Sequence, residues 1–175
     1  MIFISGVHGV GKSFFCEKLK EVVGVETYAA SHLIEQKRNI SFASDKKITD
    51  IEDNQNYLLD AVAELKENNP FFVLDGHFCL LDREGTITRV PEQFFIDLNP
   101  EAIVLLTEKS EIIAKRRMAR DGLKIDLEQT DRFQEAEMTY AKEVADKLRV
   151  PLQISQGAED LQSTMEFIKK RRWSV

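Results

Sequence analysis

The sequence predicts an α/β fold, a parallel sheet covered by helices on both faces, and three observations support this prediction. Short apolar runs alternate with segments of helical periodicity along the chain. The runs are apolar almost throughout, which is typical of strands buried on both faces of a parallel sheet. The chain has 175 residues and no repeat or linker, so one domain is expected over residues 1–175. We expect five strands in this sheet, between two layers of helices.

The chain begins with strand and helix signals in turn. An apolar strand is predicted at 2–5. A helix is predicted at about 12–23 and should end at Gly24, because glycine favours the position after a helix. A second helix is predicted near 30–38.

A third helix is marked at both of its ends. Thr49 and Glu52 form a capping-box pattern, and apolar residues then recur at helical spacing as far as the segment before Pro70. The run "FFVLD" at 71–75 follows directly. It is apolar until its last residue and is predicted to form a fully buried strand.

The second half of the chain repeats the alternation of strands and helices. A strand at 102–106 precedes a helix at about 109–120, and the stretch 121–131 is polar with an Asp-Gly turn signal. A long amphipathic helix follows this stretch. Its apolar face comprises Phe133, Ala136, Tyr140, Ala141, Val144 and Leu148. A strand at 151–155 and a helix at about 158–171 complete the pattern.

Charge and cysteine content exclude several classes of protein. The 24 basic and 30 acidic residues give a net charge of −6, which argues against general nucleic-acid binding. The basic run at 169–172 fits the end of a final helix, where the helix dipole favours cations; the alternative is a binding tail. Cys16 and Cys79 suggest neither a disulfide framework nor a zinc site, and no run reaches the ~18 apolar residues of a membrane span. We expect a soluble cytoplasmic protein without nucleic-acid or membrane partners.

A phosphate-binding loop is predicted at residues 6–13. "GVHGVGKS" matches the Walker A pattern G-x-x-x-x-G-K-[S/T] and lies between a predicted strand and a predicted helix. In this setting backbone N–H groups and the helix dipole attract an anion, Lys12 reaches the outer phosphates, and the Ser13 hydroxyl can ligate Mg²⁺. The alternative is a tight turn without a ligand. The residues expected to bind ATP and Mg²⁺ are Gly6, Gly9, Val10, Gly11, Lys12, Ser13 and Phe14.

Asp75 ends the predicted buried strand, where a carboxylate is costly unless charge or hydrogen bonds compensate it. In a protein with a phosphate loop, Mg²⁺ held jointly by Ser13 and Asp75 would supply that compensation. The alternative is an aspartate that caps a turn before Gly76. His77 shares a face with Asp75 if the strand geometry continues. It could orient a phosphoryl acceptor or relay a proton, or be a hydrogen-bonded structural histidine.

Three arginines lie in the segment "KRRMARDG" at residues 115–122. Arg116 and Arg120 are four residues apart and should share one helix face, from which Arg117 is rotated away. Arg116 and Arg120 would suit a charge clamp on a transferring phosphoryl group, and Arg132 across the polar stretch could join them. The alternative is a solvated basic face.

In the order and spacing of these motifs, nearly the whole chain resembles the archaeal-type adenylate kinases and the small eukaryotic nuclear adenylate kinases. "GVHGVGKS" resembles their loop, "VLDGH" their Asp-x-His element, and "LNPEAIVLLTE" the strand that follows. "ISQGAEDL" resembles their final strand and the loop that borders the adenine. The resemblance implies a P-loop NTPase three-layer sandwich with an acceptor-binding insertion at about 30–60 and a short lid at about 118–131. It also implies that Arg120 and Gly157 help to bind the nucleotide.

The acceptor side departs from the pattern of this family. Where the family often has an arginine for the acceptor's phosphate, this chain has "SDKKIT", so the expected acceptor-binding residues are Ser31, Lys46 and Lys47. Lysine holds a phosphate as a point charge, without the bidentate fork of arginine. His8 replaces the usual proline of the loop, and no chemistry is assigned to it.

Three functions are compatible with these motifs. The first is ATP-dependent phosphoryl transfer to a nucleoside monophosphate, an anionic acceptor that needs positioning and charge neutralisation more than a base. The second is a kinase of a hydroxyl-bearing small molecule or nucleoside, in which Asp75 or His77 would meet the hydroxyl as a base. The third is a slow ATPase whose nucleotide state controls a partner protein. The expected catalytic residues are Lys12, Asp75, His77, Arg116 and Arg120.

Overall fold

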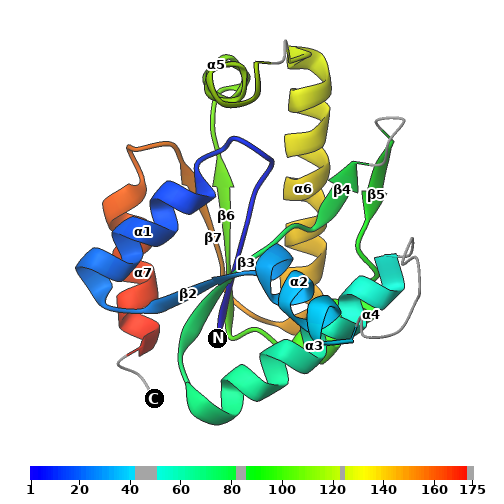
Figure 1. Ribbon diagram of the computed structural model, residues 1–175. Helices are drawn as coiled ribbons and strands as arrows, with labels where there is room; N and C mark the ends of the chain where they lie inside the picture. The colour runs from blue at the N-terminus through cyan, green and yellow to red at the C-terminus, as the bar shows by residue number, and fades with distance from the viewer. Residues whose placement is uncertain (42–50, 82–85, 123–124, 173–175) are drawn as a thin grey trace.

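A five-stranded parallel sheet forms the centre of the computed structural model (Figure 1). Its strands are, in spatial order, β2 (Glu26–Ala29), β3 (Phe72–Asp75), β1 (Ile2–Ser5), β6 (Ala102–Thr107) and β7 (Leu152–Gln156). Every neighbouring pair is parallel, so the carboxyl ends of the strands meet at one edge of the sheet. The structure describes residues 1–41, 51–81, 86–122 and 125–172. The predicted α/β fold with a parallel sheet is confirmed.

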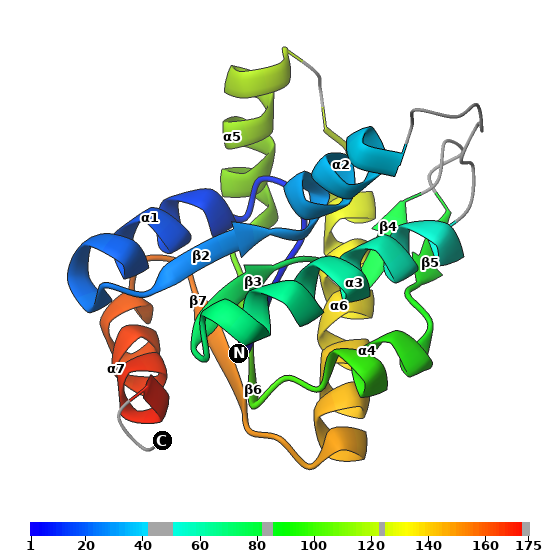
Figure 2. The same ribbon diagram turned by 60° about the horizontal axis from the view of Figure 1, so that its bottom comes forward.

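Helices cover both faces of this sheet (Figures 1 and 2). One face carries α1 (Lys12–Val23) and α7 (Leu161–Arg172), and the other carries α3 (Ile51–Asn68), α4 (Glu92–Leu98) and α6 (Leu127–Leu148). The remaining elements are α2 (Ala30–Ser41), which packs on α3; α5 (Ser110–Asp121), which follows β6; and the antiparallel hairpin of β4 (Cys79–Leu81) and β5 (Ile87–Arg89), which contacts α6. Within the described ranges, no helix is long and apolar enough to cross a membrane.

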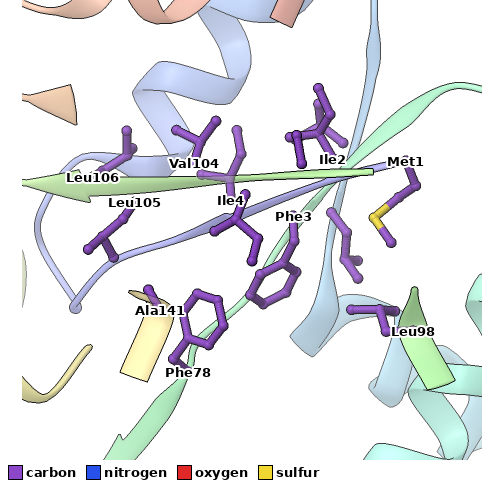
Figure 3. Packing of buried hydrophobic residues seen from close by; sticks show 14 of the residues in the cluster. Met1, Ile2, Phe3, Ile4, Phe78, Leu98, Val104, Leu105, Leu106 and Ala141 are labelled. Carbon is purple, nitrogen blue, oxygen red and sulfur yellow. The ribbon is translucent and has the colours of Figure 1, made fainter. Parts of the chain in front are cut away.

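The core supports the strand that leads into the phosphate loop. Figure 3 shows Phe3 on one side of β1 with Phe78 and Ala141, and Ile2 on the other side. The Phe3 ring meets the rings of Phe78 and Phe95 edge to face, with centroids 5.2 and 5.6 Å apart. Because β1 is buried along its whole length, the loop after it starts from a rigid base.

Most of the predicted elements occur close to their predicted positions. The helix α1 ends at Gly24, whose φ of 65° is left-handed, as expected for a glycine after a helix. The strand β2 was not predicted individually, because its sequence ETYA has a partly exposed pattern and lacks an apolar run. The helix α4 and the hairpin, whose strands are only three residues each, were also not predicted.

The start of α6 differs from the prediction. The stretch 121–131 was expected to be an irregular polar segment, but α6 begins at Leu127. Asp126 explains the difference, because its side chain caps the helix by accepting from the backbone N of Glu128 and Gln129. The last turn of α5 and the first turn of α6 therefore contribute most of the segment expected to be a lid.

The start of α3 cannot be compared in the same way. Thr49 and the side chain of Glu52, the predicted capping pair, lie outside the residues that the structure describes. The predicted helix itself is present as α3, and it ends at Asn68, before Pro70.

Candidate functional site

The loop between β1 and α1 has the backbone geometry of an anion-binding segment. Gly9 and Gly11 have φ angles of 87° and 114°, conformations that residues with a Cβ rarely adopt. Gly11 is also the N-cap of α1, so the free N–H groups of the first helical turn lie at the loop. Backbone donors and the positive end of a helix dipole together suit a phosphate group.

Lys12 lies where the loop meets β3. Its Nζ donates to the Gly6 carbonyl oxygen at 2.6 Å, lies 3.5 Å from His77 Nε2 and is 4.0 Å from Asp75 Oδ1. Burial lowers the pKa of Lys12, and the negative charge of Asp75 opposes this shift. The structure thus brings together Lys12, Asp75 and His77, which are far apart in the sequence.

Asp75 is the last residue of β3, and its register opposite Ile4 of β1 puts it next to the loop. Burial raises the pKa of the Asp75 carboxyl, and the charge of Lys12, with that of His77 when its ring is protonated, acts in the opposite direction. Asp75 and Ser13 line the same cavity. A carboxylate and a hydroxyl at this position fit Mg²⁺, which takes few oxygens from the protein and completes its shell with phosphate and water.

Glu137 of α6 is a buried carboxylate that the sequence analysis did not identify. Its side chain is only 1% exposed. Its Oε2 accepts from Ser5 Oγ at 2.6 Å, and its Oε1 accepts from the backbone N of Phe78 and Cys79 at 3.0 and 2.9 Å. His77 Nδ1 lies 3.7 Å from the same Oε1. Glu137 therefore connects α6 to the ends of two elements that carry the site.

His8 of the loop packs on His77, with ring centroids 4.4 Å apart. Burial lowers the pKa of His8 to about 4, and the neighbouring charges of His77, Lys12, Arg117 and Arg120 act in the same direction. His8 is therefore neutral at pH 7. It adds an uncharged polar ring to a loop surrounded by cations.

Two arginines of α5 contact the loop. Arg116 donates to the Val10 carbonyl oxygen at 2.7 Å and to Glu108 at 3.2 Å. Arg117, which was predicted to lie on a different helix face from Arg116 and Arg120, lies against Gly9 of the loop, a contact that was not predicted. Helical phase gives only the direction in which the Cβ leaves the helix, whereas the long stem of Arg117 bends back across the glycine.

In the described structure, Arg120 and Arg132 pair with neighbouring acids at exposed positions. Arg120 donates to both carboxylate oxygens of Asp121, at 2.6 and 2.8 Å, and it lines a cavity beside the loop. Arg132 pairs with Glu128 on its own helix rather than joining the arginines of α5. Of the two residues, Arg120 is the one placed where it could reach a substrate.

Among the cavities beside the loop in the described structure, one has a volume of about 390 Å³ and is here called the smaller cavity. It lies between the loop, β6 and the segment after β7, and its lining includes Gly11, Glu108, Arg116 and Gly157. A Cβ at Gly157 would come within 2.9 Å of the Glu108 carboxylate, so the Glu108 side chain would have to shift to admit a larger residue, and the φ of 55° adds backbone strain. The predicted nucleotide-binding residue Gly157 thus lines a cavity together with Arg116.

The larger cavity, of about 700 Å³, extends from Lys12 and Asp75 to α2 and α3. Its apolar walls are formed by Phe3, Ile34, Leu58, Leu80, Val90 and Phe94. The helices α2 and α3 add the polar side chains Ser31, His32, Asn54 and Gln55. Lys46 and Lys47, the other expected acceptor-binding residues, lie outside the residues that the structure describes.

The chain is similar to known proteins over most of its length. A family model described as an AAA domain matches residues 5–134. An adenylate kinase from Methanococcus aeolicus is 24% identical over an alignment of 190 positions. This alignment covers 95% of this chain and 98% of that protein. The expected resemblance to adenylate kinases is thereby confirmed.

Solved structures of two kinases share the fold. A gluconokinase from Sinorhizobium meliloti 1021 has a TM-score of 0.53 and 18% identity, over 97% of this chain and 89% of that chain. A sugar kinase from Janibacter sp. has a TM-score of 0.53 and 16% identity, over 99% of this chain and 91% of that chain. These likenesses confirm the predicted P-loop fold. They do not identify the acceptor, which has to be inferred from the residues of the site.

Proposed function

We propose that this chain, which belongs to the AAA-domain family, is a kinase that transfers a phosphoryl group from ATP to a nucleoside monophosphate. Similarity to an adenylate kinase over 95% of the chain supports phosphoryl transfer as the reaction. The apolar wall of the larger cavity is the observation that carries the choice of acceptor.

ATP would bind with its phosphates at the loop and its base in the smaller cavity. Arg116 lines this cavity, and its hydrogen bonds to Val10 and Glu108 fix the guanidinium next to the loop. Gly157 lines the same cavity and adds no side chain to it. These residues would position the donor without taking part in the transfer itself.

The transferring phosphoryl group would lie near Lys12, with Ser13 and Asp75 as the residues that hold Mg²⁺. When bound, Mg²⁺ neutralises charge on the phosphate oxygens. In the described part of the chain, no group of three His, Cys, Asp or Glu side chains could hold a metal alone, which suits an ion that shares its shell with phosphate and water. Arg120 lines the larger cavity and would neutralise charge between donor and acceptor.

The walls of the larger cavity favour a base over a sugar. Each hydroxyl of a buried sugar or sugar acid needs a hydrogen-bond partner, and apolar walls do not supply one. A nucleobase, in contrast, buries two apolar faces and hydrogen-bonds only at its edge. Asn54 and Gln55 line this cavity and would meet that edge, while Lys12 and Arg120, which line it too, would meet the acceptor's phosphate.

A hydroxyl-bearing acceptor is the second candidate. Asp75 and His77 line the same cavity, and either could meet an incoming hydroxyl as a base. The gluconokinase and the sugar kinase support this candidate only at the level of the fold. For both candidates the partner is a small molecule.

We also propose a cytoplasmic location, because Cys16 and Cys79 are free thiols.

The proposal is tested by measuring ADP formation from Mg-ATP with a panel of acceptors. The panel contains nucleoside monophosphates, free nucleosides, gluconate and a tube without acceptor. We expect at least one nucleoside monophosphate to accelerate ADP formation and to yield the matching diphosphate. Acceleration only by nucleosides or gluconate would support the second candidate, and equal slow hydrolysis in every tube would favour a regulatory ATPase.

A variant pair tests whether the larger cavity holds the acceptor. Ile34→Trp adds bulk to the cavity wall and should raise KM for the acceptor while leaving KM for Mg-ATP unchanged. Ile112→Trp makes the same change on the exposed side of α5 and serves as the control. Equal acceptor KM values in the two variants would show that the acceptor binds elsewhere.

A further inference from the structure

Glu137 is a buried titratable group to which the proposed reaction assigns no role. Its three hydrogen bonds join the last residue of β1 to the first residues after His77. Ser5 directly precedes the loop that carries Lys12, and Phe78 and Cys79 follow shortly after Asp75. A carboxylate at 1% exposure is costly, and none of its described hydrogen bonds comes from a charged side chain. Backbone donors alone would be satisfied by a neutral amide at the same position.

His77 offers a reason for the negative charge. Its Nδ1 is buried, has no hydrogen-bond partner among the described residues, and lies 3.7 Å from Glu137 Oε1. Its Nε2 lies 3.5 Å from Lys12 Nζ. An ammonium group can only donate, so Nε2 must be the acceptor in this contact and the ring proton must be on Nδ1. That proton then faces the carboxylate of Glu137.

The charge of Glu137 also acts on Lys12 directly, because it favours the protonated ammonium and so partly offsets the effect of burial on the pKa of Lys12. Glu137 is thus connected to Lys12 in two ways, through the imidazole of His77 and through space. Both connections favour one arrangement, with a protonated Lys12 facing the unprotonated nitrogen of His77. A hydrogen-bond partner on one nitrogen of a histidine commonly fixes the role of the other.

We propose that Glu137 is a positioning residue that holds His77 in the Nδ1–H tautomer, so that the Nε2 lone pair stays beside Lys12 at the wall of the larger cavity. This inference rests on the phosphoryl transfer proposed above but not on the identity of the acceptor. Glu137 touches neither substrate. It acts through His77 and Lys12, whose ammonium must be directed at the transferring group during the reaction.

The tautomer can be measured without any acceptor. In protein labelled with ¹⁵N at histidine, the ring nitrogen and carbon shifts of neutral His77 report which nitrogen carries the proton. We expect Nδ1–H in the wild type and a smaller Nδ1–H fraction in Glu137→Gln, which keeps the side-chain shape and an oxygen for the backbone donors. Glu135→Gln makes the same change at an exposed position of α6 and should leave the tautomer as in the wild type. A wild-type His77 with its proton on Nε2 would overturn the proposal.

Kinetics separate positioning from a purely structural role. With the best acceptor of the panel, Glu137→Gln should lower kcat by about tenfold or more while KM for Mg-ATP changes little, on the scale found for residues that orient site groups. In a His77→Asn background the same substitution should have little further effect, because the residue through which it acts is gone. An equal loss in both backgrounds, or a less stable protein with unchanged tautomer and kcat, would refute the proposal. If no acceptor accelerates the reaction, the proposed function fails while the tautomer of the wild type still decides this inference.

Discussion

The side chain of Arg117 lies directly on Gly9 of the phosphate loop. A Cβ at Gly9 would come within 2.6 Å of Arg117 Cγ and 3.1 Å of Cδ. Further along this side chain, Nε is 4.0 Å from Asp121 and is buried without a hydrogen-bond partner in the described structure. The helix α5 thus rests on the loop through the apolar stem of an arginine, and only a glycine leaves room for that contact.

Gly9→Ala should therefore destabilise the protein more than backbone strain alone does. The positive φ of Gly9 by itself costs about 1–2 kcal/mol once a Cβ is added, and displacement of Arg117 adds to this cost. Gly122→Ala is the control, since Gly122 has a φ of 69° but nothing within 4 Å of an added Cβ. Urea unfolding should show the larger loss for Gly9→Ala. Combining each change with Arg117→Ala should reduce the difference between them, and no reduction would show that the contact is unimportant.

Lys12→Met should abolish most of the turnover without unfolding the protein. Methionine keeps the length of the side chain but removes the charge that lies near Asp75 and His77. We expect kcat to fall by about 10²-fold or more, the scale for groups that stabilise a transferring phosphoryl group. Lys18→Met makes the same change on the exposed side of α1 and should retain wild-type turnover. Equal activity of the two variants would contradict the assignment of Lys12 to the phosphoryl-transfer site.

Arg116→Lys should weaken the binding of ATP more than it slows the transfer. Lysine keeps the positive charge but cannot donate to Val10 and Glu108 from one planar fork. We expect KM for Mg-ATP to rise by about tenfold, which corresponds to the loss of one charge-assisted hydrogen bond. Arg132→Lys, on the exposed side of α6, is the matched control. A change in acceptor KM instead would place Arg116 on the other side of the reaction.

His8 predicts a dependence of stability on pH. Its pKa is about 4 in the folded protein, against 6.5 for an unperturbed histidine. Between these values the unfolded chain binds a proton at His8 that the folded protein does not bind, so the folded state loses stability as the pH falls from about 6.5 towards 4. His8→Gln should remove this contribution. As the pH falls over this interval, the free energy of unfolding of the His8→Gln variant should therefore decrease less than that of the wild type.

The titration of His8 gives a direct check of this account. Its imidazole shifts, followed by NMR in the protein without nucleotide, should have a midpoint close to 4. The positive charges of His77, Lys12, Arg117 and Arg120 disfavour its protonation, whereas the carboxylate of Asp121 favours it. A midpoint near 6.5 would contradict the desolvation and the nearby charges on which this prediction depends.

Local signals in the sequence were sufficient for the loop and for most elements, because glycines, caps and apolar runs act on their immediate neighbours. Gly24 and the run that forms β6 are examples. The edge strand β2 was missed because its partner strand, rather than its own composition, stabilises it. The position of Arg117 was missed because a helical projection does not include the length of the side chain.

Glu137 shows the limit of local signals most clearly. A charged residue on the apolar face of α6, four positions from both Phe133 and Ala141, was visible in the sequence as an irregularity. Its partners were not, since Ser5 is 132 residues away and Phe78 is 59 residues away. Only the folded chain shows that this carboxylate has donors on two sides and lies beside a histidine of the site.

Phe14 lines both cavities, and its side chain is 57% exposed. The side chain of Phe14 would therefore contact both the donor and the acceptor. Whichever ligand arrives first restricts the rotamers of Phe14, so the ordering of that side chain is already complete when the second ligand binds. The affinity for each ligand would then depend on the other through this side chain, in addition to their contact at the transferring group. This dependence is reciprocal by thermodynamic linkage, and a smaller side chain at position 14 would uncouple the two binding events.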